Sequence, residues 1–196
     1  MIDRDSRKFL EWWDSARQGR SMPRRRDLPL EQIGGLLPRL AVSSAISPTA
    51  VILRLTGTLI DQHAGRSTKG VNILDITPEE SRDLRGQRLW RIATRPCGGV
   101  MTFEYGVTPE DLAPLTAITL PVQADAAGEP VQLFMLFSSE ESTIWHRPNL
   151  ELATAILMPG KFSYVDTGAG IPEDETALPL AVPLIFGDLP DTANAP

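Results

Sequence analysis

Cysteine is nearly absent from this chain: Cys97 is the only one in 196 residues, so no intramolecular disulfide can form. A lone cysteine suits a reducing compartment. No apolar run approaches the roughly 18 residues that a membrane-spanning helix needs, and Met1–Asp5 is charged where a secretory signal would be apolar. We therefore expect a cytoplasmic protein without a membrane span.

A surplus of positive charge is also missing. The formal net charge is −6, and the segment from Phe162 to Pro196 holds six acids and no lysine or arginine, so residues 1–161 sum to zero. A chain of this charge lacks the cationic surface that binds nucleic acid. The basic run Arg24–Arg26 is short. It indicates a solvated turn or salt-bridge donors, with a phosphate or lipid contact as the alternative.

Sequence signs of catalysis and of metal binding are missing as well. No nucleophile elbow is present, and neither His63 nor His146 stands in a recognisable pattern with Cys97. The pairs Gly98-Gly99 and Gly168-x-Gly170 precede no predicted helix, so they do not form a phosphate loop. Zinc takes about four ligands, which one cysteine and two distant histidines do not supply. We expect no catalytic residue, no bound metal and an inert, partly buried Cys97 thiol.

What the sequence does contain begins with an amphipathic helix over residues 5–18. Phe9, Trp12 and Trp13 recur at helical spacing, and Gly19 stands where a C-terminal cap belongs. Two interpretations of this aromatic face stay open. It docks onto the domain's own core, or it makes a dimer or partner contact, because aromatic residues dominate interface energetics.

Strands follow an irregular segment. Three prolines interrupt residues 20–40 and predict that no long helix forms there. The β-rich segments are then a strand beginning at Ala41, followed by Val51–Leu55, Met101–Tyr105, Ile118–Val122 and Val131–Phe137. Four residues are taken as solvent-facing, namely Arg54, Glu104, Thr119 and Gln132. The alternation then directs ten residues to the core: Leu53, Leu55, Met101, Phe103, Tyr105, Ile118, Leu120, Leu133, Met135 and Phe137.

One helix separates the second and third strands. The segment Thr77-Pro78-Glu79-Glu80 predicts an N-cap threonine, a proline at the first helical position and glutamates suited to the helix dipole. Leu84, Leu89 and Ile92 supply the apolar face, and Pro96 ends the helix. Strand runs with a helix between them indicate an α+β fold, here a five-stranded antiparallel sheet with helices on one face.

The chain divides into three regions. Residues 1–40 are an N-terminal helix and a lead-in rich in proline and arginine, residues 41–140 are the main domain, and residues 141–196 are an acidic, proline-rich C-terminal extension. Within that extension, Leu150–Met158 predicts a short helix and Phe162–Val165 a strand, with an extended tail beyond them.

Three segments carry a resemblance to a known family. The first segment runs through Trp13, Arg17, Gly19-Arg20, Met22-Pro23, Arg25, Asp27, Ile33 and Leu36-Leu37-Pro38. The second segment is Arg54–Thr58. The third joins Gly65-Arg66 to Gly70 across Ser67-Thr68-Lys69. Over roughly residues 10–140 the sequence resembles a PAS-domain subfamily of mainly alphaproteobacterial single-domain proteins, formerly a domain of unknown function. The resemblance implies a PAS fold for residues 41–140 and a signalling or regulatory role.

The same resemblance bears on cofactors. Haem-binding PAS domains commonly take their axial histidine from the long helix, but residues 77–95 contain none, and His63 in the preceding turn is the alternative. Flavin photoreceptor PAS domains carry an Asn-Cys-Arg motif before the long helix, whereas Cys97 follows it. We expect neither haem nor flavin nor metal, and the cofactor stays open.

Pockets in such folds form in the concave apolar space between sheet and helices. The residues expected to line this space are Leu55, His63, Trp90, Met101, Phe103, Tyr105, Leu120 and Met135. They bind a small apolar ligand, or they simply fill the core.

Two functional hypotheses follow. In the first, the chain is a PAS-type regulatory module that senses a small ligand or binds other proteins, and forms a homodimer through Phe9, Trp12 and Trp13. Its output would pass to a signalling partner, since no kinase, cyclase or DNA-binding segment is attached. In the second, it is a ligand-free structural adaptor with a filled core. An enzyme on the same α+β scaffold is a third alternative.

Overall fold

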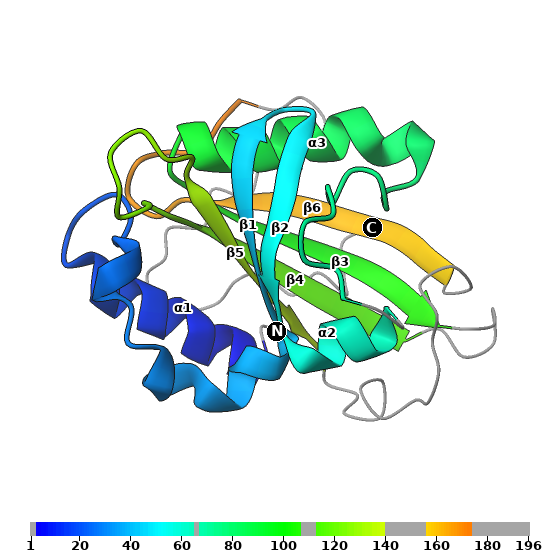
Figure 1. Cartoon of the computed structure of the whole chain (residues 1–196), viewed down its shortest axis with the longest axis horizontal. Coiled ribbons are helices and arrows are strands. Elements are labelled where there is room, and N and C mark those ends of the chain that lie inside the picture. The colour runs from blue at the N-terminus through cyan, green and yellow to red at the C-terminus, as the bar shows by residue number, and fades with distance from the viewer. Residues whose placement is uncertain (1–2, 65–66, 107–112, 140–155, 174–196) are drawn as a thin grey trace.

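A six-stranded antiparallel sheet forms the centre of the computed structural model, which describes residues 3–64, 67–106, 113–139 and 156–173 (Figure 1). The strand order across the sheet is β2-β1-β5-β4-β3-β6. The connection between β2 and β3 contains the helices α2 (Thr58–His63) and α3 (Glu79–Thr94). The strands are β1 (Leu40–Ser47), β2 (Ala50–Thr56), β3 (Gly98–Gly106), β4 (Ala113–Val122), β5 (Gln132–Ser138) and β6 (Ile156–Val165).

The α+β class and the five expected strands are confirmed, but the sheet has a sixth strand, β6, paired with β3 at the edge. It contains the predicted strand Phe162–Val165. The helix predicted over Leu150–Met158 is wrong for residues 156–158, which belong to β6, and its remainder lies outside the described residues. The prediction was wrong because Pro159 was interpreted as the residue that ends a helix. An edge strand tolerates proline, and here Pro159 pairs with Phe103 beside a register shift.

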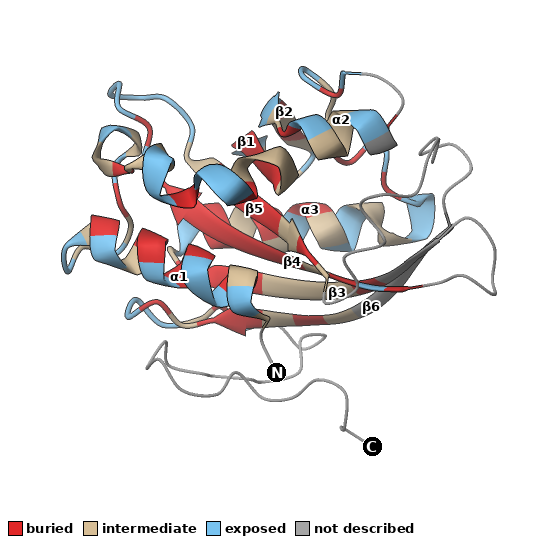
Figure 2. Cartoon of the chain, turned by 90° about the horizontal axis from the view of Figure 1, so that it is seen from below, coloured by how far each residue is buried: buried red, intermediate tan, exposed pale blue. Residues whose placement is uncertain are grey.

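Helices cover both faces of the sheet, not one face as the sequence predicts. The helix α3 packs on one face, while α1 (Arg4–Arg17) and the 3-10 segment η2 (Leu30–Arg39) pack on the other. Figure 2 shows buried residues concentrated in the strands that lie between α1 and α3. A shorter 3-10 turn, η1 (Arg25–Asp27), joins α1 to η2. The central strands are therefore apolar on both sides, which explains why β4 and β5 read as nearly continuous apolar runs.

This double covering corrects the predicted direction of several side chains. Along β5, Leu133 and Met135 face α3, whereas Phe134 and Leu136 face α1. Along β4, Ile118 and Leu120 also face α1. They do not share a core with Leu133 as the sequence predicts, and Thr119, which was expected to face solvent, lines a cavity beneath α3.

A β-bulge at Arg54 turns the end of β2. Val42 pairs with Leu55 and Ser43 pairs with Leu53, so Arg54 is an extra residue in β2. Leu55 therefore lies on the side of Val42, opposite to Leu53, and 48% of it is exposed. The prediction that Leu55 joins the Leu53 core is wrong because strict alternation cannot register an inserted residue.

The helix α3 is confirmed, but its predicted cap is not. The helix begins at Glu79, with Pro78 at the N-cap position and no side-chain cap. Thr77 therefore stands one residue too early to cap it. Its buried hydroxyl instead donates a hydrogen bond of 2.8 Å to the carbonyl oxygen of Ile73.

Candidate ligand-binding cavity

A cavity of about 370 Å³ lies between α3 and the strands β3, β4 and β5. Small-molecule sites span roughly 300–1,000 Å³, so this volume admits a small ligand. The lining residues are Thr77, Pro78, Ser81, Leu84, Arg85, Arg88, Leu89, Gly99, Met101, Phe103, Ala117, Thr119, Met135, Phe137 and Phe162.

Strand register assembles the floor of the cavity. Met101 pairs with Ala117, which in turn pairs with Phe137, and one step along the sheet Gly99 pairs with Thr119, which pairs with Met135. Paired residues project to the same face of a sheet. The floor is thus apolar apart from a single hydroxyl, that of Thr119.

Gly99 sets how closely α3 approaches the floor. A Cβ atom at this position would lie 2.6 Å from Cδ1 of Ile92 on α3 and 3.2 Å from the ring of Phe162. Real Cβ contacts are not that short, so the glycine allows the helix to rest against β3 at its C-terminal end. Toward the N-terminal end of α3 the cavity opens.

The N-terminal half of α3 forms the roof. Ser81, Arg85 and Arg88 recur at helical spacing and bring one polar stripe over the cavity. The guanidinium carbon of Arg88 lies 4.3 Å from the centre of the Phe162 ring, a cation–π contact that anchors this side chain at the cavity wall.

Arg85 is held at the cavity by Thr77. Its Nη1 donates a hydrogen bond of 2.9 Å to the Thr77 hydroxyl oxygen. Burial lowers the pKa of the Arg85 guanidinium to about 10. Even so it stays protonated at neutral pH, so the roof carries a fixed positive charge next to an apolar floor.

The structure brings together three of the eight predicted pocket residues: Met101, Phe103 and Met135 line the cavity. Leu120 faces α1 because β4 is buried on both sides. The bulge at Arg54 directs Leu55 to the face of the sheet opposite the cavity.

Trp90 lies on α3, half-buried against the same core but outside the cavity lining. His63 ends α2 and Tyr105 lies in β3, and the side chains of both are outside the described part of the chain. Sequence reasoning missed Arg85 and Arg88. The sequence pattern that could have identified them is the helical spacing of Ser81, Arg85 and Arg88, which places all three on one face of α3. It was not used because the lining of the cavity was expected to be apolar.

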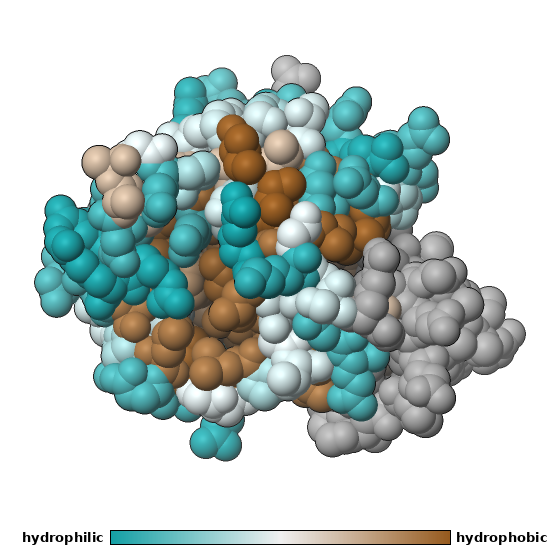
Figure 3. All heavy atoms as spheres, viewed as in Figure 1, coloured by the Kyte–Doolittle hydropathy of each residue, from teal (hydrophilic) through white to brown (hydrophobic). Residues whose placement is uncertain are grey.

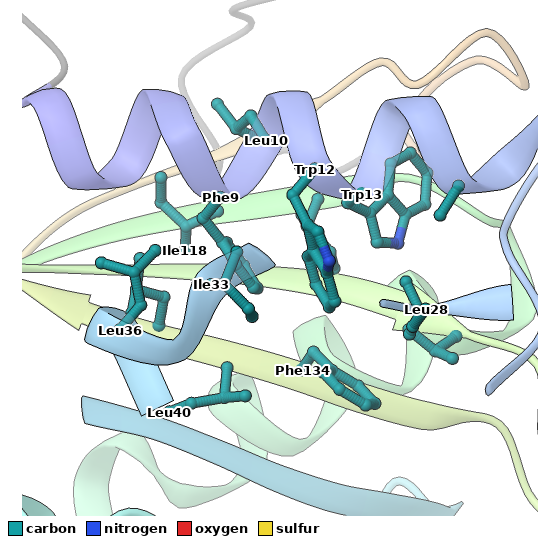
Figure 4. Close-up of a cluster of buried hydrophobic side chains, with 14 of the residues drawn as sticks. Phe9, Leu10, Trp12, Trp13, Leu28, Ile33, Leu36, Leu40, Ile118 and Phe134 are labelled. Carbon is teal, nitrogen blue, oxygen red and sulfur yellow. The ribbon is translucent and has the colours of Figure 1, made fainter. Parts of the chain in front are cut away.

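The aromatic residues of α1 lie inside the protein. Phe9 and Trp13 are fully buried and Trp12 is 4% exposed. Figure 4 shows Phe9 and Trp12 between α1 and the sheet, near Ile33 and Phe134. The structure corrects their assignment to a dimer or partner interface, because their surface is already used within the chain. The other interpretation, docking onto the domain's own core, describes what they do.

A second, open groove lies on the α1 side, between η2 and the strands β1, β2 and β5. Its volume is also about 370 Å³. Leu30 and Leu37 of η2 form one wall and Leu55 the other, and the guanidinium carbon of Arg25 lies 5.3 Å from the ring centre of Phe134. Figure 3 shows apolar side chains gathered on this face of the molecule.

Cys97 is buried and belongs to the core under α3. Burial, with a smaller contribution from Asp166, raises the pKa of its thiol to about 12. A thiol of this kind is protonated at neutral pH, which suits a packing role.

An antiparallel sheet with a helix closing a cavity over it defines the chain as an α+β domain built around a small-molecule-sized space. Within this class the chain belongs to the PAS-domain family, because a family model described as PAS domain matches residues 1–136. Comparisons with curated proteins and with solved structures each found no match. PAS domains are in general sensory or signalling modules rather than enzymes. Among the described residues, no helix has the length and apolarity to cross a membrane.

Proposed function

We propose that this chain is a regulatory PAS module that senses a small ligand in the cavity beneath α3 and passes the signal to a separate signalling protein. The observation that carries the proposal is the cavity itself, whose floor is three strands and whose roof is one helix. A ligand there contacts both layers at once. We place the module in the cytoplasm, because a lone cysteine suits a reducing compartment.

The same geometry suggests how a ligand bound in the cavity changes the surface of the protein. The helix α3 is held against β3 through Ile92 and Gly99 and against the β1–β2 turn at Gly86, whereas the part of its N-terminal half that precedes Gly86 spans the cavity. A ligand that binds one position of this half better than another shifts the population toward that position. The exposed side of α3 is then the surface that a protein partner would read.

Cavity filling tests the proposal. Ala117 lies on the floor in mid-sheet, and a longer side chain there projects into the empty space. We expect native mass spectrometry of the purified wild-type chain, or thermal-shift screening of small metabolites against it, to find a ligand that Ala117→Met does not bind. Thr58→Met, on the other groove, is the matched control and should bind as wild type does.

A ligand-free adaptor is the second candidate, and the open groove beside Leu55 is the observation that favours it. Here the groove would take an apolar segment of a signalling protein, and the cavity would stay empty. A molecule retained by the wild type and lost in Ala117→Met excludes this alternative. Either candidate function is compatible with a homodimer, which would form through a surface other than Phe9, Trp12 and Trp13.

A further inference from the structure

We propose that the cavity beneath α3 takes an anionic amphiphile: a carboxylate that binds Arg85, with an apolar chain or ring lying on the strand floor. This inference rests on the proposed function and names its ligand class. It departs from the small apolar ligand that the sequence predicts, since the roof of the cavity is charged.

The charge of the lining is one-sided. Arg85 and Arg88 both line the cavity, and no acidic residue is found among its described lining residues. Of the four ion pairs between described residues, none includes Arg85. Arg85 is half-buried, and a cation partly removed from water without an anionic partner carries a desolvation cost. A bound carboxylate would supply that partner.

The donors of Arg85 are only partly used. A guanidinium has five N–H donors in a planar fork, and among the described residues Arg85 makes one hydrogen bond, to the Thr77 hydroxyl. That hydroxyl also donates to the Ile73 carbonyl, so it is satisfied and fixed in direction. Thr77 is therefore a positioning residue, which holds the guanidinium at the cavity and leaves the remaining donors for a ligand.

The shape of an arginine head favours a carboxylate. Its fork pairs with the two oxygens of a carboxylate through parallel, charge-assisted hydrogen bonds. Arg88 lies against the Phe162 ring at the same wall. Ser81, one turn before Arg85 on the same face, supplies a further hydroxyl.

The floor provides the complementary surface for an apolar tail. Met101, Phe103, Met135 and Phe137 line it. Methionine side chains adapt to tails of different shape, and aromatic rings supply large apolar contact area. A cavity of about 370 Å³ admits a medium-length chain or a single ring system and excludes a two-chain lipid. The ligand class is thus a monocarboxylate with one apolar tail, such as a medium-chain fatty acid or an aryl carboxylate.

Three probes separate the contributions of charge and tail. Calorimetric titration of the full chain compares decanoate with decanol, which keeps the tail and lacks the charge, and with acetate, which keeps the charge and lacks the tail. We expect decanoate to bind at least about tenfold more tightly than decanol, since a hydrogen bond to a charged group contributes about 1.5–3 kcal/mol. Acetate should bind too weakly to titrate.

Variants locate the charge that is responsible. Arg85→Met should weaken decanoate binding by about 10- to 100-fold and leave decanol binding within a few-fold of wild type. Arg85→Lys should restore part of the loss. The matched control is Arg82→Met on the same helix, since Arg82 binds the Thr77 carbonyl oxygen but does not line the cavity. It should bind decanoate as the wild type does.

Two results overturn the inference. One is decanol binding as tightly as decanoate to the wild type, a comparison that needs no folded variant. The other is equal decanoate affinity in Arg85→Met and wild type. After either result, the proposed function would still stand if a neutral ligand bound the wild type and did not bind Ala117→Met. If no probe binds, and no native or screened ligand distinguishes wild type from Ala117→Met, the inference and the proposed function fail together.

Discussion

The indole nitrogen of Trp13 donates a hydrogen bond of 2.9 Å to the carbonyl oxygen of Pro121. This bond joins α1 to β4 across 108 positions of sequence, inside the core. A second indole, that of Trp12, donates at 3.0 Å to the carbonyl oxygen of Pro29. Two apolar side chains whose polar atoms need specific partners thus fix the rotation of α1 on the sheet. The helix is part of the domain's core and not an appendage to it.

Replacing Trp13 by phenylalanine should therefore destabilise the domain. Trp13→Phe leaves the Pro121 carbonyl oxygen without its donor in a buried site, which costs about 1–3 kcal/mol, in addition to lost apolar contact. Urea unfolding followed by circular dichroism measures the change. Trp12→Phe is the matched control and should cost less, because the bond of Trp12 to Pro29 is only partly buried. Equal losses in the two variants would contradict this account.

Periodicity predicted most of the fold because it depends on local pattern. Apolar residues at helical spacing located α1 and α3, and β-rich runs located β1 to β5. The pattern could not tell which face of each strand meets which helix. A strand buried on both sides carries no alternation that singles out a solvent face, so Ile118 and Leu120 were assigned to the wrong core.

The candidate site was predicted less well, for reasons that lie in non-local pairing. Met101, Phe103 and Met135 were found because apolar alternation marks a strand face. Leu55 was misplaced because an inserted residue, Arg54, reverses the alternation after it. Arg85 was missed because its position over the floor follows from the packing of α3 across the sheet, which no short segment encodes.

Gly86 is predicted to be intolerant of alanine. A Cβ atom there would overlap the backbone carbonyl oxygen of Pro48, at the turn between β1 and β2, and would lie 3.1 Å from Cδ1 of Leu74. Backbone cannot move aside as a side-chain tip can, so Gly86→Ala should destabilise the domain by about 1–3 kcal/mol. Thermal unfolding reports the shift.

Gly34 offers the control for that substitution. Apart from its chain neighbours and nearby helix backbone, no atom lies within 4 Å of a Cβ built on it, and its backbone does not require a glycine. Gly34→Ala should therefore be neutral or stabilise by up to about 1 kcal/mol, through the unfolded state. If Gly86→Ala proved as harmless as Gly34→Ala, α3 would not lie as close to the β1–β2 turn as described.

Alkylation of Cys97 should be slow in the folded protein. The thiol is buried, and its pKa of about 12 lies three pH units above the ordinary value of 9.0. At mildly alkaline pH the reactive thiolate is then about a thousandfold scarcer than in an exposed cysteine. Mass spectrometry of iodoacetamide-treated protein should show little labelling until guanidinium chloride unfolds the chain. Rapid labelling of the native protein would show that the core under α3 opens readily.

The start of α1 should make stability depend on pH. Burial alone would raise the pKa of Asp3, but hydrogen bonds from Ser6 and Ser138 and from the backbone of Ser6 and Asp5 outweigh it and lower that pKa below the ordinary value of 3.8. The two hydroxyls donate to one carboxylate oxygen at 2.6 and 2.8 Å. The other oxygen accepts the N–H groups of Asp5 and Ser6 and caps the helix.

A group whose folded-state pKa is lowered stabilises the fold above its unfolded-state pKa, and this contribution is lost as the pH falls through the folded-state value. Asp3→Ala should therefore reduce the free energy of unfolding by about 0.5–2 kcal/mol near neutral pH, as expected for loss of an N-cap. The difference from wild type should shrink as the pH falls below 3.8. Urea unfolding across this range measures it, with Asp3→Asn separating the charge from the hydrogen bonds. A difference between wild type and Asp3→Ala that stayed constant down to the lowest pH would show that the carboxylate's charge plays no part in holding α1 to β5.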